Sequence, residues 1–183
     1  TSEFEALNRI RKLVKNSEFK DLLKNGVAET SVFWKDPQTD IMCKCRFDYM
    51  IKGNIIVDLK TIRTLRKKDI INEIFSLDRR YYTQAAHYIE GLKALKRIKG
   101  LEVGGECFYF IFVSKDNPVE MRVVKIEDDI LEIGKEECEQ ALITFIKSYE
   151  KFGENEWREE QPILQLGSDD IPVWFNYYGG LND

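Results

Sequence analysis

The sequence has little cysteine, a single histidine and no long apolar run. The four cysteines stand at positions 43, 45, 107 and 138 and form no Cys-x-x-Cys pair and no Cys/His cluster, which argues against a zinc or iron–sulfur centre. A secreted scaffold of this size would carry more cysteine, so we expect reduced thiols and a cytoplasmic protein. His87 stands alone, which excludes a metal site built from several histidines of this chain. No apolar stretch approaches the ~20 residues of a membrane span, so we expect no membrane partner.

What the sequence does contain is ordinary globular composition. It has 183 residues, of which 43% are hydrophobic, and 28 Lys and Arg against 32 Asp and Glu give a formal charge of −4. That apolar content is too high for a disordered chain and sufficient for a real core. The first residue is Thr1, and no signal segment follows it. We therefore expect one domain over 1–183, with an irregular tail over 153–183.

The spacing of apolar residues changes along the chain between helical and strand periods. It predicts helices over 3–14, 18–24, 66–76, 79–99 and 127–152. It predicts strands over 27–34, 41–49, 54–60, 105–114 and 120–126, with a turn at 115–118. The second and third strands form a plausible hairpin. This order predicts an α/β (α+β) domain, with a central mixed β-sheet of about five strands flanked by helices.

The chemistry is concentrated in the predicted strand 54–60. Asp58 and Lys60 are two residues apart, so their side chains project to one face, and the hairpin can bring Asp48 alongside. Two neighbouring carboxylates repel each other unless a proton or a cation lies between them. Magnesium, which takes one or two carboxylates with waters and phosphate oxygens, is a natural occupant. The alternative is a solvated surface ion pair, but the preceding apolar run, 55–57, favours an interior strand.

A second set of candidates lies on the predicted helix 79–99. Gln84 and Tyr88 are four residues apart and share a helical face, with Tyr81 on the same side. Core packing is the alternative for such aromatic residues, and we expect His87 to be a structural or surface residue. Glu29 adds a third acid on the first strand, where it is as easily a surface residue as a ligand.

Basic residues follow the candidate strand directly. They are Arg63, Arg66, Lys67 and Lys68, with Arg80 further along. A cluster of this kind at the end of the strand could contact a phosphate backbone. It could equally be the solvated start of a helix.

Three phrases of the sequence together resemble a known family. They are Cys43-Lys44-Cys45-Arg46-Phe47-Asp48, Val57-Asp58-Leu59-Lys60-Thr61 and Tyr82-Thr83-Gln84-Ala85-Ala86-His87-Tyr88. In order and spacing they resemble the PD-(D/E)XK nuclease superfamily with its Q-x-x-x-Y motif, over about residues 1–150. The closer resemblance is to the RecE type, exodeoxyribonuclease VIII and its phage and prophage relatives. Phe47 stands where the family motif has proline.

The resemblance implies a restriction-endonuclease-like core and an exonuclease on double-stranded DNA ends, acting 5′→3′ in recombination with Mg²⁺ or Mn²⁺. It implies Asp48 and Asp58 as metal ligands, with the Leu59 carbonyl as a further ligand. It implies Lys60 as the catalytic lysine, and Gln84 and Tyr88 as groups that place the DNA end and the attacking water.

The resemblance also implies partners and an upstream segment. Relatives form ring-like homo-oligomers around DNA and work with a single-strand annealing protein. They carry an upstream helix with a metal-binding His or Glu, and this sequence has no histidine before His87. We therefore expect that helix either to precede Thr1 or to be absent from the native protein. Two alternatives stay open: a related endonuclease or repair nuclease, and an inactive nuclease-fold module that binds DNA or a partner.

Overall fold

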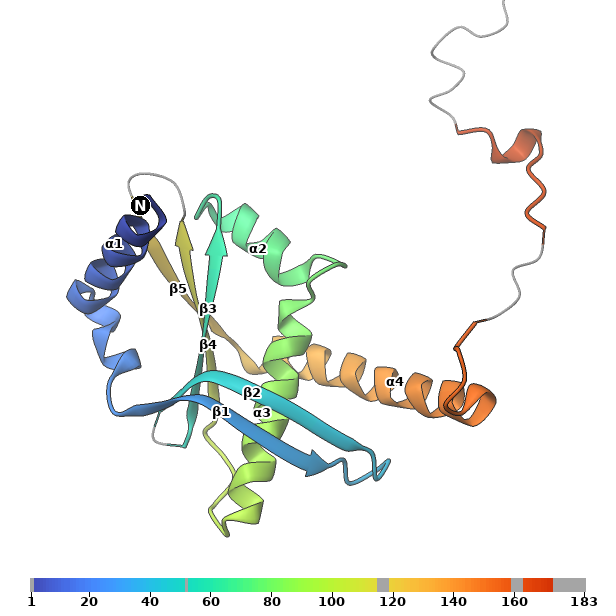
Figure 1. The fold of residues 1–183 in the computed structure, drawn as a ribbon, viewed down its shortest axis with the longest axis horizontal. Helices are drawn as coiled ribbons and strands as arrows, with labels where there is room; N and C mark the ends of the chain where they lie inside the picture. Colours follow the sequence, from blue (N-terminus) through green and yellow to red (C-terminus); the bar gives the residue numbers. More distant parts are fainter. Residues whose placement is uncertain (1, 52, 115–118, 159–162, 173–183) are drawn as a thin grey trace, which may run out of the picture. The chain divides into compact units, whose positions relative to one another are not determined.

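The structure is a computed structural model, and it describes residues 2–51, 53–114, 119–158 and 163–172 (Figure 1). Its elements in chain order are α1 (Ser2–Asn16), η1 (Glu18–Leu23), β1 (Gly26–Lys35), β2 (Met42–Ile51), β3 (Ile55–Ile62), α2 (Lys67–Phe75), α3 (Tyr81–Ile98), β4 (Cys107–Ser114), β5 (Met121–Ile126), α4 (Asp128–Phe152) and η2 (Ser168–Asp170). Every predicted helix and strand is present within a few residues of its expected bounds. The predicted turn at 115–118, and residues 159–162 and 173–183 of the predicted tail, lie outside the described residues.

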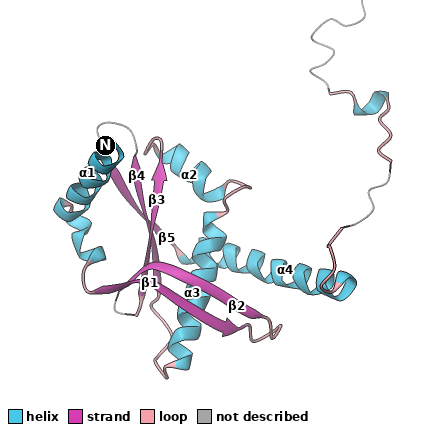
Figure 2. Ribbon diagram, viewed as in Figure 1, coloured by secondary structure: helices cyan, strands magenta, loops and turns pink. Residues whose placement is uncertain are grey.

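The strands form one mixed sheet in the order β1-β2-β3-β4-β5 (Figure 2). Neighbouring strands are antiparallel except β3 and β4, which are parallel. Parallel strands need a long crossover connection, and α2 and α3 supply it here. The predicted hairpin of β2 and β3 and the predicted mixed sheet with flanking helices are both confirmed.

The two faces of the sheet carry cores of different size. On one face, Phe47, Phe108, Phe110 and Phe112 pack with buried residues of α2 and α3 and with half-buried residues of α4. The other face carries a smaller cluster of residues from β2, β3 and β4, covered by α1 and η1. Figure 1 shows α1 on one side of the sheet and the other three helices on the opposite side. The candidate residues on α3 therefore face the larger core.

Close approach between α3 and α4 depends on one glycine. A Cβ atom at Gly134 would lie 2.6 Å from the carbonyl oxygen of Tyr82 and 2.9 Å from the Cβ of Ala86. No side chain fits there unless the two helices move apart. Gly134 thus holds the first half of α4 against α3, on the same side of the sheet as the candidate site.

The chain divides at Lys147 into two units, so that the second unit begins within α4. The first unit, Thr1–Lys147, contains the whole sheet and every candidate site residue. Within the ranges that the structure describes, no helix combines the length and the apolar character needed to cross a bilayer.

Candidate active site

Asp58 is the buried centre of the candidate site. It lies in the middle of β3 beside Phe110 of β4, and only 1% of it is exposed. Burial of a carboxylate costs free energy unless polar partners offset the loss of water. Gln84 of α3 donates a hydrogen bond from Nε2 to Oδ1 at 2.9 Å, and Lys60 Nζ lies 2.7 Å from Oδ2. The structure therefore brings three of the predicted residues, Asp58, Lys60 and Gln84, into direct contact.

Asp48 reaches the same place because β2 and β3 separate there. The ladder between these strands ends at the pair Tyr49–Val57. Beyond it, the Leu59 N–H donates to Oδ2 of Asp48 at 3.2 Å, so a side chain replaces the next backbone acceptor. Figure 1 shows the β1–β2 hairpin running away from β3, β4 and β5. We call the region between Asp48 and Asp58 the fork.

The Leu59 backbone contributes a second polar group to the fork. The N–H and C=O of one strand residue point to the same edge of the strand. Because the Leu59 N–H points to Asp48, the Leu59 carbonyl also faces the fork. The Leu59 side chain is exposed and takes no part in this arrangement.

The electrostatics of the fork favour a cation. Burial raises the pKa of Asp58 and the charge of Asp48 raises it further, while Lys60 and Gln84 act in the opposite sense without cancelling the rise. Oδ2 of Asp58 is buried, and within the described residues its close contact is the ion pair with Lys60 rather than a regular hydrogen bond. An under-satisfied carboxylate beside a second carboxylate and a carbonyl is a donor set that fits a hard divalent ion.

Lys60 is held between the fork and an aromatic wall. Its Nζ lies 4.5 Å from the ring centroid of Tyr81 and 5.8 Å from that of Phe110, and 18% of its side chain is exposed. An ammonium over aromatic faces gains cation–π attraction. Arg79 donates a hydrogen bond to the Tyr81 hydroxyl at 3.2 Å and so orients that ring. The sequence places Tyr81 on the right helical face, but nothing in it indicates this contact with Lys60.

Tyr88 lies on α3 one turn after Gln84, where the charges of both carboxylates of the fork act on its hydroxyl. Its ring is half-buried against Phe47, at 5.6 Å between centroids, and Phe108, at 6.2 Å. Burial raises the pKa of its hydroxyl; a hydrogen bond with Gln84 opposes the rise, and the two carboxylates add to it. Tyr88 therefore stays protonated at neutral pH and can donate a hydrogen bond.

Glu29 of β1 lies across from Asp48 in the register of the sheet, but its carboxylate pairs with Arg46. The flanking pairs Ala28–Tyr49 and Thr30–Phe47 place it across from Asp48 on β1. Its φ of 54° is in the left-handed region, and its exposed carboxylate forms an ion pair with Arg46. Within the described ranges, no three acidic, histidine or cysteine side chains gather closely enough to hold a metal. Glu29 is thus not joined to the two carboxylates of the fork as a third acid.

The predicted basic residues fall into two groups. Arg63, Arg66 and Lys67 line an open cleft where β3 ends, and Lys68 is exposed in the first turn of α2. Arg80, by contrast, pairs with Glu137 of α4 at 3.2 Å and so ties the start of α3 to α4. Its guanidinium is engaged within the protein.

A buried ion pair lies at the far end of α3. Lys96 Nζ is 2.5 Å from Glu106 Oε1, and the two side chains are 6% and 4% exposed. Lys96 also donates to the Gly104 carbonyl, and the Gly104 N–H donates to Glu106. The hydrogen bond from Lys96 holds the pKa of Glu106 below its usual value, although burial acts in the opposite sense. The pair fixes the loop between α3 and β4.

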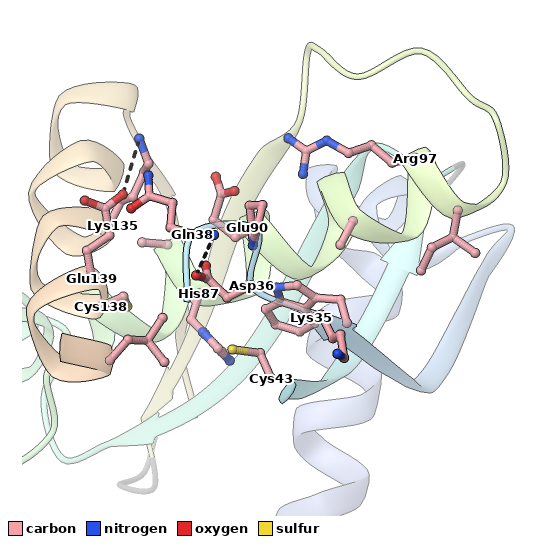
Figure 3. A pocket seen from close by; sticks show the side chains of 16 residues that line it. Lys35, Asp36, Gln38, Cys43, His87, Glu90, Arg97, Lys135, Cys138 and Glu139 are labelled. Carbon is pink, nitrogen blue, oxygen red and sulfur yellow. Dashed lines mark hydrogen bonds and ion pairs between the residues drawn. The ribbon is translucent and has the colours of Figure 1, made fainter. Parts of the chain in front are cut away.

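A more enclosed hollow of about 360 Å³ lies between α3, α4 and the turn after β1 (Figure 3). His87, Cys43 and Cys138 line it, and none of the fork residues does. His87 packs against Trp34 at 5.0 Å between ring centroids, and its Nε2 lies 3.1 Å from the Lys44 carbonyl oxygen. All four cysteines are free thiols, as expected. The packing of His87 fits the structural role expected for it.

The mixed sheet, with Asp58 and Lys60 on β3 at the fork and Gln84 on α3, defines the class as a PD-(D/E)XK nuclease fold. A family model described as "PDDEXK-like domain of unknown function (DUF3799)" matches residues 1–157. The chain therefore belongs to this PDDEXK-like family. A search of curated proteins gives no match.

Two of the solved structures that are similar to the chain illustrate the likeness. One is a crystal structure of the "Putative exonuclease" from Eubacterium rectale, with a TM-score of 0.62 and 17% identity over 80% of this chain. The chain spans 54% of the length of that protein. The other is the crystal structure of SSO0001, with a TM-score of 0.39 and 14% identity, covering 80% of this chain and 59% of that one. The first likeness supports the fold, and the second is too distant to carry an argument.

Proposed function

We propose that this protein is a divalent-metal-dependent exonuclease of the RecE type that hydrolyses linear double-stranded DNA from its ends, 5′→3′. The observation that carries the proposal is the fork: two carboxylates from separating strands, an ammonium 2.7 Å from one of them, and a helix that presents Gln84 and Tyr88. The PDDEXK-like family supports the nuclease class. The exonuclease mode and its polarity rest on the motif resemblance.

In this proposal Asp48, Asp58 and the Leu59 carbonyl hold one Mg²⁺ or Mn²⁺ in the fork. The chemistry that the ion supplies when bound is polarisation of the scissile phosphate and acidification of the attacking water. Asp58 is prepared for this role because Gln84 occupies Oδ1, while Oδ2 has no hydrogen-bond donor among the described residues. Glu29 is left out of the ligand set because Arg46 engages its carboxylate.

Lys60 and Tyr88 act on the phosphate and the water. Hydrolysis places developing negative charge on the phosphate oxygens, and preorganised donors lower the barrier by binding that charge. Lys60 is such a donor, because Asp58 and the Tyr81 ring fix its ammonium at the fork. Tyr88 is protonated and shares the α3 face of Gln84, so it can donate to the water or to the DNA end.

The proposed biological setting is recombination. As in the RecE type, we propose a ring-like homo-oligomer around DNA and a single-strand annealing protein as partner. These proposals rest on the sequence motifs alone. Gel filtration with light scattering tests the first: a monomer at micromolar concentration, with and without duplex DNA, would contradict it.

The activity itself is tested with end-labelled linear duplex and covalently closed circular duplex, each with Mg²⁺ and with EDTA. We expect metal-dependent release of label from the 5′ end of the linear duplex and intact circles. Asp58→Asn should abolish the release, whereas Asp40→Asn, an exposed carboxylate in a turn, should leave it unchanged. Cleavage of circles at the same rate would point to an endonuclease.

One observation favours an inactive binding module as the second candidate: within the described residues, the fork contains two acids rather than three. Calorimetry with Mn²⁺ on the wild type and on Asp58→Ala separates the two candidates. Mn²⁺ binding that is lost in Asp58→Ala supports the nuclease. Absence of Mn²⁺ binding in both proteins, together with retained DNA binding, supports the inactive module.

A further inference from the structure

An open cleft of about 1050 Å³ lies at the C-terminal end of β3, beyond the fork. It forms where β3 and β4 end, β5 begins and α2 begins. Its charged lining consists of Arg63, Arg66, Lys67, Arg122 and Glu120. The first three follow Lys60 closely in the chain, whereas Arg122 comes from β5 and was not expected from the sequence.

The cleft is cationic within an acidic chain. The whole protein carries a formal charge of −4, yet four of the five charged residues that line the cleft are basic. Arg66 pairs with Asp69 of α2 at 2.7 Å. In the part of the chain that the structure describes, neither Arg63 nor Arg122 has an acidic partner, and both are exposed. These cations are available to a ligand, and phosphate groups are the ligands that arginine clusters bind best.

The register of the sheet connects the cleft to the fork. Lys60 of β3 is paired with Phe112 of β4, and Phe112 is paired with Arg122 of β5. Residues paired across a sheet share one face, so Arg122 lies on the same face as Lys60 and Asp58. Two strand spacings put the Cα atoms of Lys60 and Arg122 about 10 Å apart. Arg63 follows directly after Ile62, the last residue of β3, and lines the same cleft.

The separation of Lys60 and Arg122 is short on the scale of a DNA strand. One strand of a duplex presents a phosphate about every 3.4 Å of helix axis. Consecutive phosphates lie farther apart through space than this rise, because the strand also winds around the axis, so a distance of about 10 Å spans at most about three nucleotides. A strand whose scissile phosphate lies at the fork can reach the cleft without a break.

We infer that the cleft is a second phosphate subsite, in which Arg122 and Arg63 bind a phosphate of the DNA within about three nucleotides of the scissile bond. The inference rests on the proposed function, because the fork fixes where the scissile phosphate lies. The phosphate can come from two sources, the internal backbone or a 5′-terminal phosphate. Both present the same chemistry to the two guanidinium groups.

The test uses the full chain and the variants Arg122→Ala and Arg63→Ala. Lys125→Ala is the matched control, because Lys125 lies on β5 but is of opposite parity to Arg122 and pairs with Glu127 outside the cleft. Binding is measured by fluorescence anisotropy with EDTA over a range of salt concentrations. The ligands are linear duplexes with 5′-phosphate or 5′-hydroxyl ends. Thermal unfolding checks that each variant is folded, and Arg122→Lys tests whether charge alone suffices.

We expect each arginine variant to bind about tenfold more weakly and to lower the slope of log K against log salt by about one. A loss on both duplexes identifies a backbone phosphate, and a loss on the 5′-phosphorylated duplex alone identifies the terminal one. Affinities equal to that of Lys125→Ala overturn the subsite, even if the wild type degrades DNA. If the arginine variants lose affinity but the wild type shows no metal-dependent cleavage, the cleft binds DNA and the nuclease proposal fails.

Discussion

Replacing Lys60 with methionine separates its catalytic contribution from its structural one. The substitution keeps an unbranched apolar side chain as far as Cε, but it removes the ammonium that lies over Tyr81 and leaves the Asp58 carboxylate buried without a counter-charge. Removal of one partner of a buried ion pair typically costs about 3–5 kcal/mol. Because Lys60 is 18% exposed and Asp58 keeps its bond from Gln84, we expect the lower end, about 3 kcal/mol, without metal.

The effect on turnover should be separate and large. Removal of a donor that binds developing charge costs about 10²- to 10³-fold in kcat. Metal binding should survive, because Asp48, Asp58 and the Leu59 carbonyl remain. A cation in the fork would also replace the lost counter-charge, so Mg²⁺ should raise the Tm of Lys60→Met more than that of the wild type.

Three assays check this reasoning: thermal unfolding with and without Mg²⁺, Mn²⁺ calorimetry, and release of label from linear duplex at saturating metal. Lys93→Met is the matched control, since its pair with Glu90 is more exposed and should contribute less than about 1 kcal/mol. Turnover equal to that of the wild type would refute the role of Lys60. Loss of Mn²⁺ binding in Lys60→Met would show instead that the lysine holds the metal ligands of the fork in position.

Further predictions concern the support of the site. Gln84→Ala should lower kcat and weaken Mn²⁺ binding while costing only about 1–3 kcal/mol of stability, because it removes a hydrogen bond to a buried carboxylate. Release of label from linear duplex measures kcat, calorimetry measures Mn²⁺ binding, and urea unfolding measures stability. Failure of the variant to fold would indicate a packing role for Gln84 instead. Glu106→Gln leaves the Lys96 ammonium buried without its counter-charge and should cost about 3 kcal/mol at pH 7. Since the folded pKa of Glu106 is lowered, its contribution is present above the ordinary carboxyl pKa and is lost as pH falls through the folded pKa; the same stability loss at pH 7 and at pH 3 would contradict this. Gly134→Ala should destabilise by about 1–3 kcal/mol, because its Cβ would clash with the backbone of Tyr82, and an unchanged Tm would refute the close packing of the helices.

The elements were predictable because their signals are local. The alternation of Cys43, Cys45 and Phe47 marks β2, and these residues are indeed buried on one face. The spacing of Asp58 and Lys60 predicts a shared face, and the ion pair between them agrees with it. The fork itself could not be predicted in detail, since it depends on the point where β2 leaves β3. There the Asp48 side chain takes the Leu59 N–H, which has no signature in the sequence.

Charged residues were the hardest to assign, because their partners come from distant segments. Arg80 was expected to contact DNA, but Glu137, 57 residues further along the chain, engages it. Glu29 and Arg46 meet only through the register of β1 and β2. Arg122 carries no local signal, and only its pairing with Phe112 places it on the face of the fork. Composition identifies the basic residues but not which of them remain accessible.

The central claim is that Asp48 and Asp58 share one hard metal ion. The most direct measurement is the anomalous difference density of crystals soaked in Mn²⁺. The account predicts a peak in the fork, with a carboxylate oxygen of Asp48, Oδ2 of Asp58 and the Leu59 carbonyl oxygen as protein ligands. A fork without density at a Mn²⁺ concentration that supports DNA cleavage, or a peak ligated by other residues, would contradict it.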